Sequence, residues 1–143
     1  MGRYKLEVLL IFVPLIYGYI ASRNLIFIHP FAFQLIFGVF WLWVGMKFGR
    51  LAISKFKSIL LGNSIWLLSF LIFIWQFVIL DDLSRNIAFT SFSQYYMLPF
   101  IWSGSKLVLI FSDTIHSSTV MILSYICMLL TFIVGFLIGC RKG

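Results

Sequence analysis

Five stretches of the chain carry no charged residue and approach or exceed the length of a membrane span. Four are strongly apolar and cover Val8 to Ser22, Asn24 to Met46, Ser58 to Leu80 and Thr114 to Cys140, while the fifth, Asn86 to Ser105, is more polar. A helix needs about 20 apolar residues to cross a hydrocarbon core about 30 Å thick. The first stretch is short, but the long side chains of Lys5 and Arg23 can snorkel to the interface and extend it.

The composition excludes a soluble globular domain. Hydrophobic residues make up 62% and charged residues 10% of the 143 residues, whereas soluble domains carry about 25% charged residues. Intrinsic disorder needs low hydrophobicity and is excluded as well. We therefore predict an all-α, polytopic membrane protein with a single membrane domain over 1–143. Its four transmembrane helices are expected at about 6–22, 31–48, 58–80 and 118–140.

The uncharged segment after the third predicted span differs from the others. It carries Asn, Gln, Ser and Thr throughout and has Pro99 in its middle. Such a stretch is a poor lone span, because backbone in hydrocarbon must satisfy its own hydrogen bonds. We predict that residues 84–112 form an extracytoplasmic amphipathic helix on the outer leaflet, or a re-entrant hairpin turned at Pro99. Helical spacing would place four aromatic residues on one face: Phe89, Phe92, Tyr96 and Phe100.

The Lys and Arg residues predict the orientation, since cytoplasmic loops retain positive charge. With four spans and both termini inside, eight of the 11 cations are cytoplasmic: Arg3, Lys5, Lys47, Arg50, Lys55, Lys57, Arg141 and Lys142. Arg23, Arg85 and Lys106 lie outside. A fifth span would reduce this asymmetry to seven against four. We expect the cytoplasmic membrane of a bacterium, a first span that is retained rather than cleaved, and no nucleic-acid partner.

Small residues spaced four apart recur on every predicted span. The pairs are Gly18 with Ser22, Gly45 with Gly49, Ser58 with Gly62, and Gly135 with Gly139. Gly38 lies on nearly the same face as Gly45. Small residues let membrane helices approach closely, so the pattern predicts helix packing, either within the chain or between copies.

Polar residues gather at the predicted outer ends of the spans. They are His29, Gln34, Gln76, Asp81, Asp82, Arg85, Asn86, Asp113 and His116. On a continuing helix, both aspartates Asp81 and Asp82 would pair with Arg85, and Asp82 would also contact Asn86. The ligand spacing of a metal site is missing, and neighbouring aspartates point different ways on a helix. We expect a helix-end salt bridge, without metal or cofactor.

Other polar residues lie within or near the spans, and each must find a partner there. Asn63 and Ser64, with Gln34 and Gln76, either join helices or line a polar path. No ionisable residue falls near the middle of a span, which argues against a proton-coupled exporter. The inner loop carries four cations suited to anionic lipid headgroups: Lys47, Arg50, Lys55 and Lys57.

The function that these patterns favour is non-catalytic. We expect a small membrane protein that acts through helix–helix contacts, as an accessory, assembly or immunity-type component. Its partners would be the lipid bilayer, other membrane proteins or a second copy. One alternative is an oligomeric transporter or channel for a small solute or ion. Another is a membrane enzyme that uses Asp81, Asp82 and His116 at its outer face.

Overall fold

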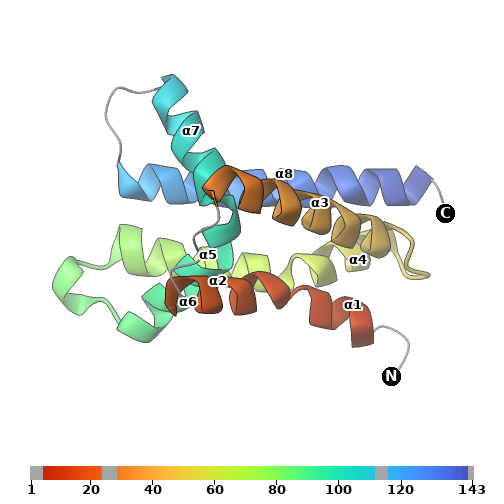
Figure 1. The fold of residues 1–143 in the computed structure, drawn as a ribbon. Helices are drawn as coiled ribbons and strands as arrows, with labels where there is room; N and C mark the ends of the chain where they lie inside the picture. Colours follow the sequence, from red (N-terminus) through yellow and green to blue (C-terminus); the bar gives the residue numbers. More distant parts are fainter. Residues whose placement is uncertain (1–4, 24–28, 112–115, 142–143) are drawn as a thin grey trace.

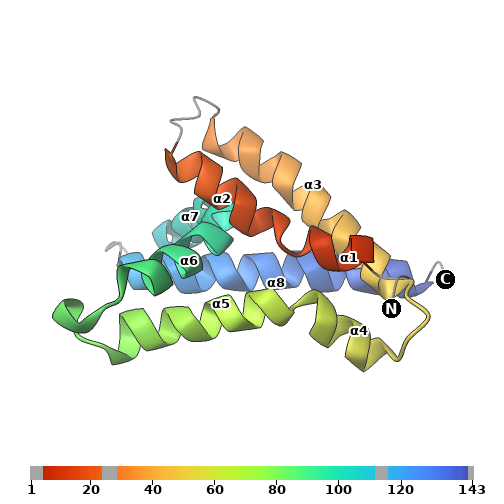
Figure 2. The same cartoon turned by 90° about the horizontal axis from the view of Figure 1, so that it is seen from below.

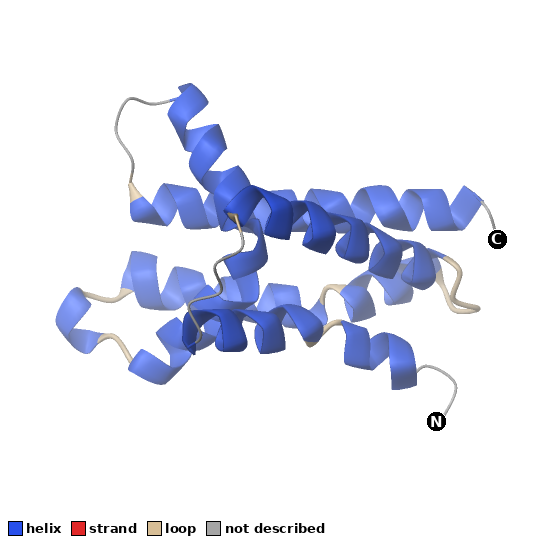
Figure 3. Cartoon of the chain, viewed as in Figure 1, coloured by secondary structure: helices blue, strands red, loops and turns tan. Residues whose placement is uncertain are grey.

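The computed structural model describes residues 5–23, 29–111 and 116–141, where every regular element is a helix (Figure 3). The all-α prediction is confirmed for these residues. The elements are α1 (Lys5–Leu10), α2 (Val13–Arg23), α3 (Pro30–Gly49), α4 (Lys55–Gly62), α5 (Ser64–Ile74), the π-helical turn η1 (Trp75–Ile79), the 3-10 turn η2 (Asp82–Ser84), α6 (Ile87–Met97), the 3-10 turn η3 (Leu98–Phe100), α7 (Ile101–Phe111) and α8 (Ser117–Arg141).

Three helical stretches are long and apolar enough to cross a membrane: Leu6–Arg23, Phe31–Gly49 and Ser117–Arg141. A fourth, formed by α4, α5 and η1, qualifies only as a broken span, because its halves are bent by 52°. The predicted helix at 58–80 is therefore not continuous. The described residues contain three candidate spans, or four when the bent pair counts as one.

The bend in the first span has a local cause. Pro14 has no N–H, so the carbonyl four residues before it loses its helical partner. The chain turns between Leu10 and Val13, and the N–H groups of the following residues donate to Phe12 O instead. Because the Leu15 N–H donates to Phe12 O, the carbonyl of Ile11 also lacks its helical partner, and it accepts a hydrogen bond from the Tyr96 hydroxyl at 3.3 Å. A residue from a distant part of the chain thus satisfies the backbone at this bend.

The bend between α4 and α5 is satisfied locally. The Asn63 Nδ2 atom donates to Ile59 O at 3.0 Å, and the Ser64 hydroxyl donates to Leu61 O at 2.8 Å. Polar side chains that bond nearby carbonyls let a membrane helix break without unpaired backbone groups. These contacts explain why a stretch that is apolar by composition does not form one straight helix.

Helices α3 and α8 make the most extensive contact between helices in the described structure. A Cβ on Gly45 would collide with the carbonyl oxygen of Phe132, and a Cβ on Gly49 with that of Phe136. Reciprocally, Gly135 and Gly139 lie against the backbone of α3. Figure 2 shows the two helices meeting near their C-terminal ends and diverging toward their N-terminal ends. The missing side chains therefore allow backbone contact within one chain.

The α6–α7 pair covers residues 87–111; α6 lies mainly against α2 and α5, and α7 lies mainly against α8. In Figure 1, α6 runs toward the centre of the molecule and α7 runs away from it again. The turn between them is buried: Pro99 is buried, and Phe100 is 3% exposed. Of the four aromatic residues expected on one face, Phe89, Phe92 and Tyr96 lie within α6, whereas Phe100 lies beyond its end in η3. Tyr96 is fully buried, whereas Phe89 is 43% exposed.

Candidate functional site

The polar residues predicted to gather at the outer ends do not form one site. His29 is exposed, and its Nδ1 atom accepts a hydrogen bond from Phe31 N at the start of α3. His116 and Asp81 are exposed as well. Asp113 lies outside the described residues. The remaining five residues divide into two groups, each of which holds one arm of the α6–α7 pair.

The first group centres on Gln76, which is fully buried in η1. Its Oε1 atom accepts from the Asn86 N–H at 2.8 Å, and its backbone carbonyl accepts from Arg85 Nε at 2.8 Å. Arg85 also forms a salt bridge with Asp82 at 2.7 Å. The expected helical pairing of Asp81 with Arg85 and of Asp82 with Asn86 is wrong, because the helix ends at η1 and Arg85 folds back onto its last turn.

The second group joins α3 to α7. The Gln34 Oε1 atom accepts from the Ser103 N–H at 2.7 Å, and the Gln34 Nε2 atom donates to the Ser103 hydroxyl. Ser103 lies in the first turn of α7, where backbone N–H groups have no partner within their own helix. Gln34 thus supplies an acceptor that α7 lacks. Both glutamines serve the same purpose at the two arms of the pair.

A third polar contact, which sequence reasoning missed, lies in the core. The Tyr125 hydroxyl donates to Ser93 O at 2.7 Å and lies 2.7 Å from the Ser69 hydroxyl. The Trp66 indole N–H donates to Tyr125 O at 3.0 Å. These bonds connect α5, α6 and α8. The sequence does contain a feature that predicts such a contact: Ser69 and Tyr125 lie inside apolar runs, where a hydroxyl must find a hydrogen-bond partner.

The predicted polar path is not assembled in the described residues. Gln34 is engaged with Ser103, and Ser64 bonds within its own turn. Asn63 lies at the break between α4 and α5, whereas Gln76 lies in η1, beyond the other end of α5. Each still has one buried atom without a hydrogen-bond partner among the described residues, Asn63 Oδ1 and Gln76 Nε2. Trp41 Nε1, in the core, is the third such atom.

The glycines predicted for packing fall into two classes. A Cβ on Gly18 would collide with the backbone of Tyr95 on α6, and one on Gly62 with the Phe132 ring. Gly104 on α7, which was not predicted, lies equally close to α8. A Cβ on Gly38, in contrast, would meet nothing within 4 Å. The packing role expected for Gly38 within the chain is therefore wrong.

Ser22 likewise takes no part in helix packing within the described structure. It is exposed, and its hydroxyl donates to Tyr19 O at 2.8 Å in its own helix. Ser58, its counterpart on α4, is fully buried and donates to Phe48 O at 2.5 Å. The two serines were expected to act alike, but Ser58 alone joins two helices.

Gly38 lies in a groove of about 470 Å³ where α3 diverges from α8. We call this the Gly38 groove; α3, α7 and α8 line it, with small or polar side chains beside apolar ones. Its lining residues are Gln34, Leu35, Gly38, Val39, Leu42, Phe100, Ser103, Cys127, Leu130 and Thr131. Leu35 and Val39 are 53% and 70% exposed. The groove is therefore open at the surface of the bundle.

The cations of the inner loop are not equivalent. The Lys55 ammonium donates to Gly49 O at 2.8 Å and so satisfies a carbonyl at the end of α3. Lys47 lies 5.2 Å from the centre of the Trp43 ring. Arg50 and Lys57 are exposed. The sequence predicted only a lipid-headgroup contact for Lys55, and the structure adds this hydrogen bond at the end of α3.

Metal chemistry has no support in the part of the chain that the structure describes, since no three His, Cys, Asp or Glu side chains there are grouped to hold an ion. Comparison of the chain with protein-family models, with curated proteins and with solved structures found no match. The geometry of the described residues makes the Gly38 groove the candidate functional site.

Proposed function

We propose that the protein is a non-catalytic integral membrane protein that binds a transmembrane helix of another protein in the Gly38 groove. The observation that carries this proposal is the contrast between Gly38 and the glycines at the helix contacts. Those glycines are in contact with a neighbouring element, whereas the space beside Gly38 is empty. Glycine costs about 1 kcal/mol relative to alanine inside a helix, and close approach of another backbone compensates for this cost.

The shape of the groove favours another protein over a second copy. In a two-fold symmetric dimer the same patch faces itself, so a concave groove would meet a concave groove. A convex helix fits the groove better, and small residues in its lining (Gly38, Ser103 and Thr131) permit close packing. Such a contact suits an accessory or assembly component of a membrane complex.

Cross-linking in cells tests this proposal. A photoreactive residue at Val39, on the rim of the groove, should give a cross-linked product of one discrete added mass. Leu71 on α5 is also exposed, at 56%, and serves as the matched position away from the groove. The product at Val39 should disappear in the Gly38→Leu variant. A product with the mass of two copies, or equal products at Val39 and Leu71, would contradict the proposal.

The proposed topology has four spans, both termini in the cytoplasm and the α6–α7 pair entering from the outer side. It is supported by the asymmetry of the Lys and Arg residues and by the buried turn at Pro99. Single cysteines at the exposed positions Ser84 and Ala52, without the native cysteines, provide a test. An impermeant thiol reagent should label Ser84→Cys in intact cells and Ala52→Cys only after lysis. The reverse pattern would overturn the orientation.

A second candidate function, transport of a small ion or solute, is favoured by the two broken helices. Discontinuous helices commonly form the binding sites of transporters, and Asn63 has a buried Oδ1 atom without a partner at one of the breaks. Potassium flux into liposomes tests it. Flux that Asn63→Leu abolishes and Thr131→Val preserves would support transport, whereas absence of flux in the unaltered protein would exclude potassium transport.

A further inference from the structure

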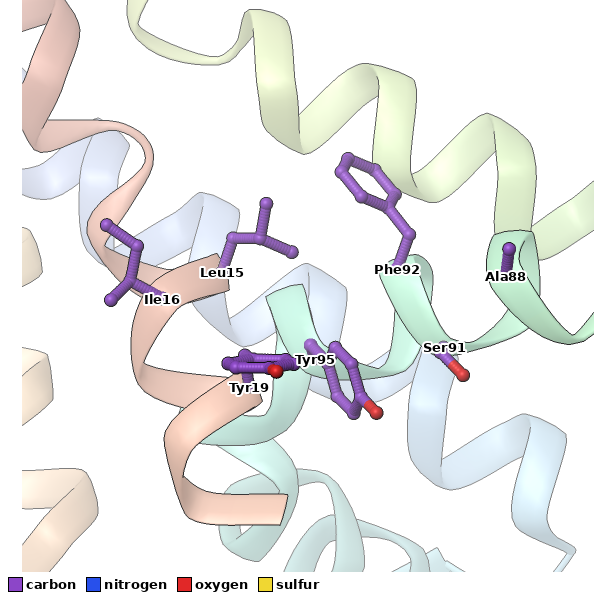
Figure 4. A pocket seen from close by; sticks show the side chains of 7 residues that line it. All are labelled: Leu15, Ile16, Tyr19, Ala88, Ser91, Phe92 and Tyr95. Carbon is purple, nitrogen blue, oxygen red and sulfur yellow. The ribbon is translucent and has the colours of Figure 1, made fainter. Parts of the chain in front are cut away.

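A second groove, of about 370 Å³, lies between α2 and α6 (Figure 4). We call it the Gly18 groove. Its lining residues are Leu15, Ile16, Tyr19, Ala88, Ser91, Phe92 and Tyr95. Figure 4 shows the side chains of Leu15, Ile16 and Phe92 on one side and the oxygen-bearing ends of Tyr19, Ser91 and Tyr95 on the other. The groove therefore has an apolar part and a hydroxyl-bearing part.

The two helices that form the Gly18 groove are in backbone contact beside it. Gly18 lies directly against the backbone of Tyr95, so α2 and α6 touch there without an intervening side chain. An α-helix with its side chains is about 10 Å across and does not fit between two helices in backbone contact. A single acyl chain is thinner. Ile16 is 56% exposed and Tyr19 48% exposed, so the groove is open along the flank of α2 from which a lipid chain would enter.

A cation lies beside the hydroxyl-bearing part. The Arg23 guanidinium lies 5.1 Å from the centre of the Tyr19 ring, and the Tyr19 and Tyr95 rings contact each other edge to face at 6.0 Å. Arg23 is exposed and forms no salt bridge within residues 5–23, 29–111 and 116–141. Because it ends the first candidate span, it lies where the polar headgroups of a bilayer begin. Guanidinium groups bind phosphate oxygens well, through several parallel donors.

We propose that the Gly18 groove binds one anionic phospholipid. One acyl chain lies against Leu15, Ile16 and Phe92, and the phosphate accepts hydrogen bonds from Arg23. The hydroxyls of Tyr19 and Ser91 donate to the phosphate or to the ester oxygens. This site is separate from the Gly38 groove and does not depend on its occupant.

Native mass spectrometry of the purified protein in mild detergent tests the lipid site. On titration with phosphatidylglycerol, the unaltered protein should retain one lipid at concentrations where phosphatidylcholine is lost. Arg23→Gln should weaken phosphatidylglycerol retention about tenfold, because it removes the charge and leaves the groove intact. Arg141→Gln is the matched control, since Arg141 is an exposed arginine at the end of another helix, α8; it should bind as the unaltered protein does.

A second variant tests the apolar part. Ile16→Trp places a larger side chain in the groove and should reduce retention of both lipids, while Leu71→Trp, on an exposed face of α5, should not. Circular dichroism and gel filtration establish that each variant is folded, and Ile16→Phe replaces Ile16→Trp if the latter is not. Equal retention of the two lipids, or an Arg23→Gln variant that binds phosphatidylglycerol as tightly as Arg141→Gln, would overturn the proposal.

Discussion

The contact between α3 and α8 and the attachment of the α6–α7 pair differ in the interactions that hold them. The first uses reciprocal glycines that bring two backbones together, with Gly45 and Gly49 facing Gly135 and Gly139. The second also has close contacts at Gly18 and Gly104, and it adds side-chain hydrogen bonds from Gln34, Gln76 and Tyr125. In a membrane neither relies on the hydrophobic effect between helices, because lipid is as apolar as the side chains.

The difference follows from the length and continuity of the helices. Long helices have all their internal carbonyl and N–H groups paired, so only shape limits how closely α3 and α8 pack. The α6–α7 pair is short and interrupted, and it brings unpaired backbone groups at its ends and at η3 into the bundle. Those groups need partners from outside the pair. We therefore expect overpacking to damage the first contact most and loss of hydrogen bonds to damage the second.

The largest expected effect is that of Gly45→Leu. A side chain there would meet the carbonyl oxygen of Phe132, which is backbone and cannot move aside. Overpacking of a tight contact costs about 3 kcal/mol of unfolding free energy. The measurement is unfolding by sodium dodecyl sulfate in mild detergent micelles. Gly38→Leu is the control and should be about as stable as the unaltered protein, because nothing lies within 4 Å. Equal losses in both variants would contradict the distinction between the two glycines.

Tyr125→Phe should have the next largest effect. It keeps the ring, which packs against Phe70 at 5.2 Å, and removes the hydroxyl that bonds Ser93 O and Ser69. Loss of these two bonds should cost about 1.5 kcal/mol of unfolding free energy in the same assay, since hydrogen bonds between membrane helices contribute about 0.6 to 1.7 kcal/mol. Tyr96→Phe, which loses one longer bond to Ile11 O, should lose less. A larger loss for Tyr96→Phe would reverse this order.

Gln34→Leu tests one arm of the α6–α7 pair alone. The variant loses both bonds to Ser103 and should destabilise α7 by about 1 kcal/mol. Hydrogen exchange should rise in residues 101–111 and remain unchanged in α8 near Gly135. Ser103→Ala keeps the backbone N–H that donates to Gln34 Oε1, so its effect should be about half as large. Uniform exchange across the whole chain in Gln34→Leu would show that the pair does not open separately.

The same two regions explain what the sequence could predict. The α3–α8 glycines were predicted as packing residues because their spacing repeats along one face. Gly38 lies seven residues before Gly45 on nearly the same face, but a Cβ there would meet nothing within 4 Å. Sequence spacing alone does not reveal where two helices diverge. Gln34 and Gln76 were predicted to need hydrogen-bond partners, but the partners themselves were not predictable. Ser103 is distant from Gln34 in the sequence, and Asn86 lies beyond the end of the helix that contains Gln76. The spans were predictable from their lack of charge, whereas the breaks depend on local bonds at Asn63 and Pro14.

The smallest expected effect concerns Lys55, whose ammonium lies at the end of α3 beside the α3–α8 contact at Gly49. Lys55→Gln removes a charge that bonds Gly49 O at 2.8 Å and complements the negative end of the helix. Such interactions contribute about 0.5 kcal/mol at exposed positions. Lys57→Gln, two residues along, should change the unfolding free energy less, because Lys57 makes no such bond in the described structure. High salt should reduce the difference between the two variants. If Lys57→Gln lowered the unfolding free energy more than Lys55→Gln does, positive charge in the loop as a whole would be responsible. The expected order, with the larger loss for Lys55→Gln, assigns the effect to the hydrogen bond between Lys55 and Gly49 O.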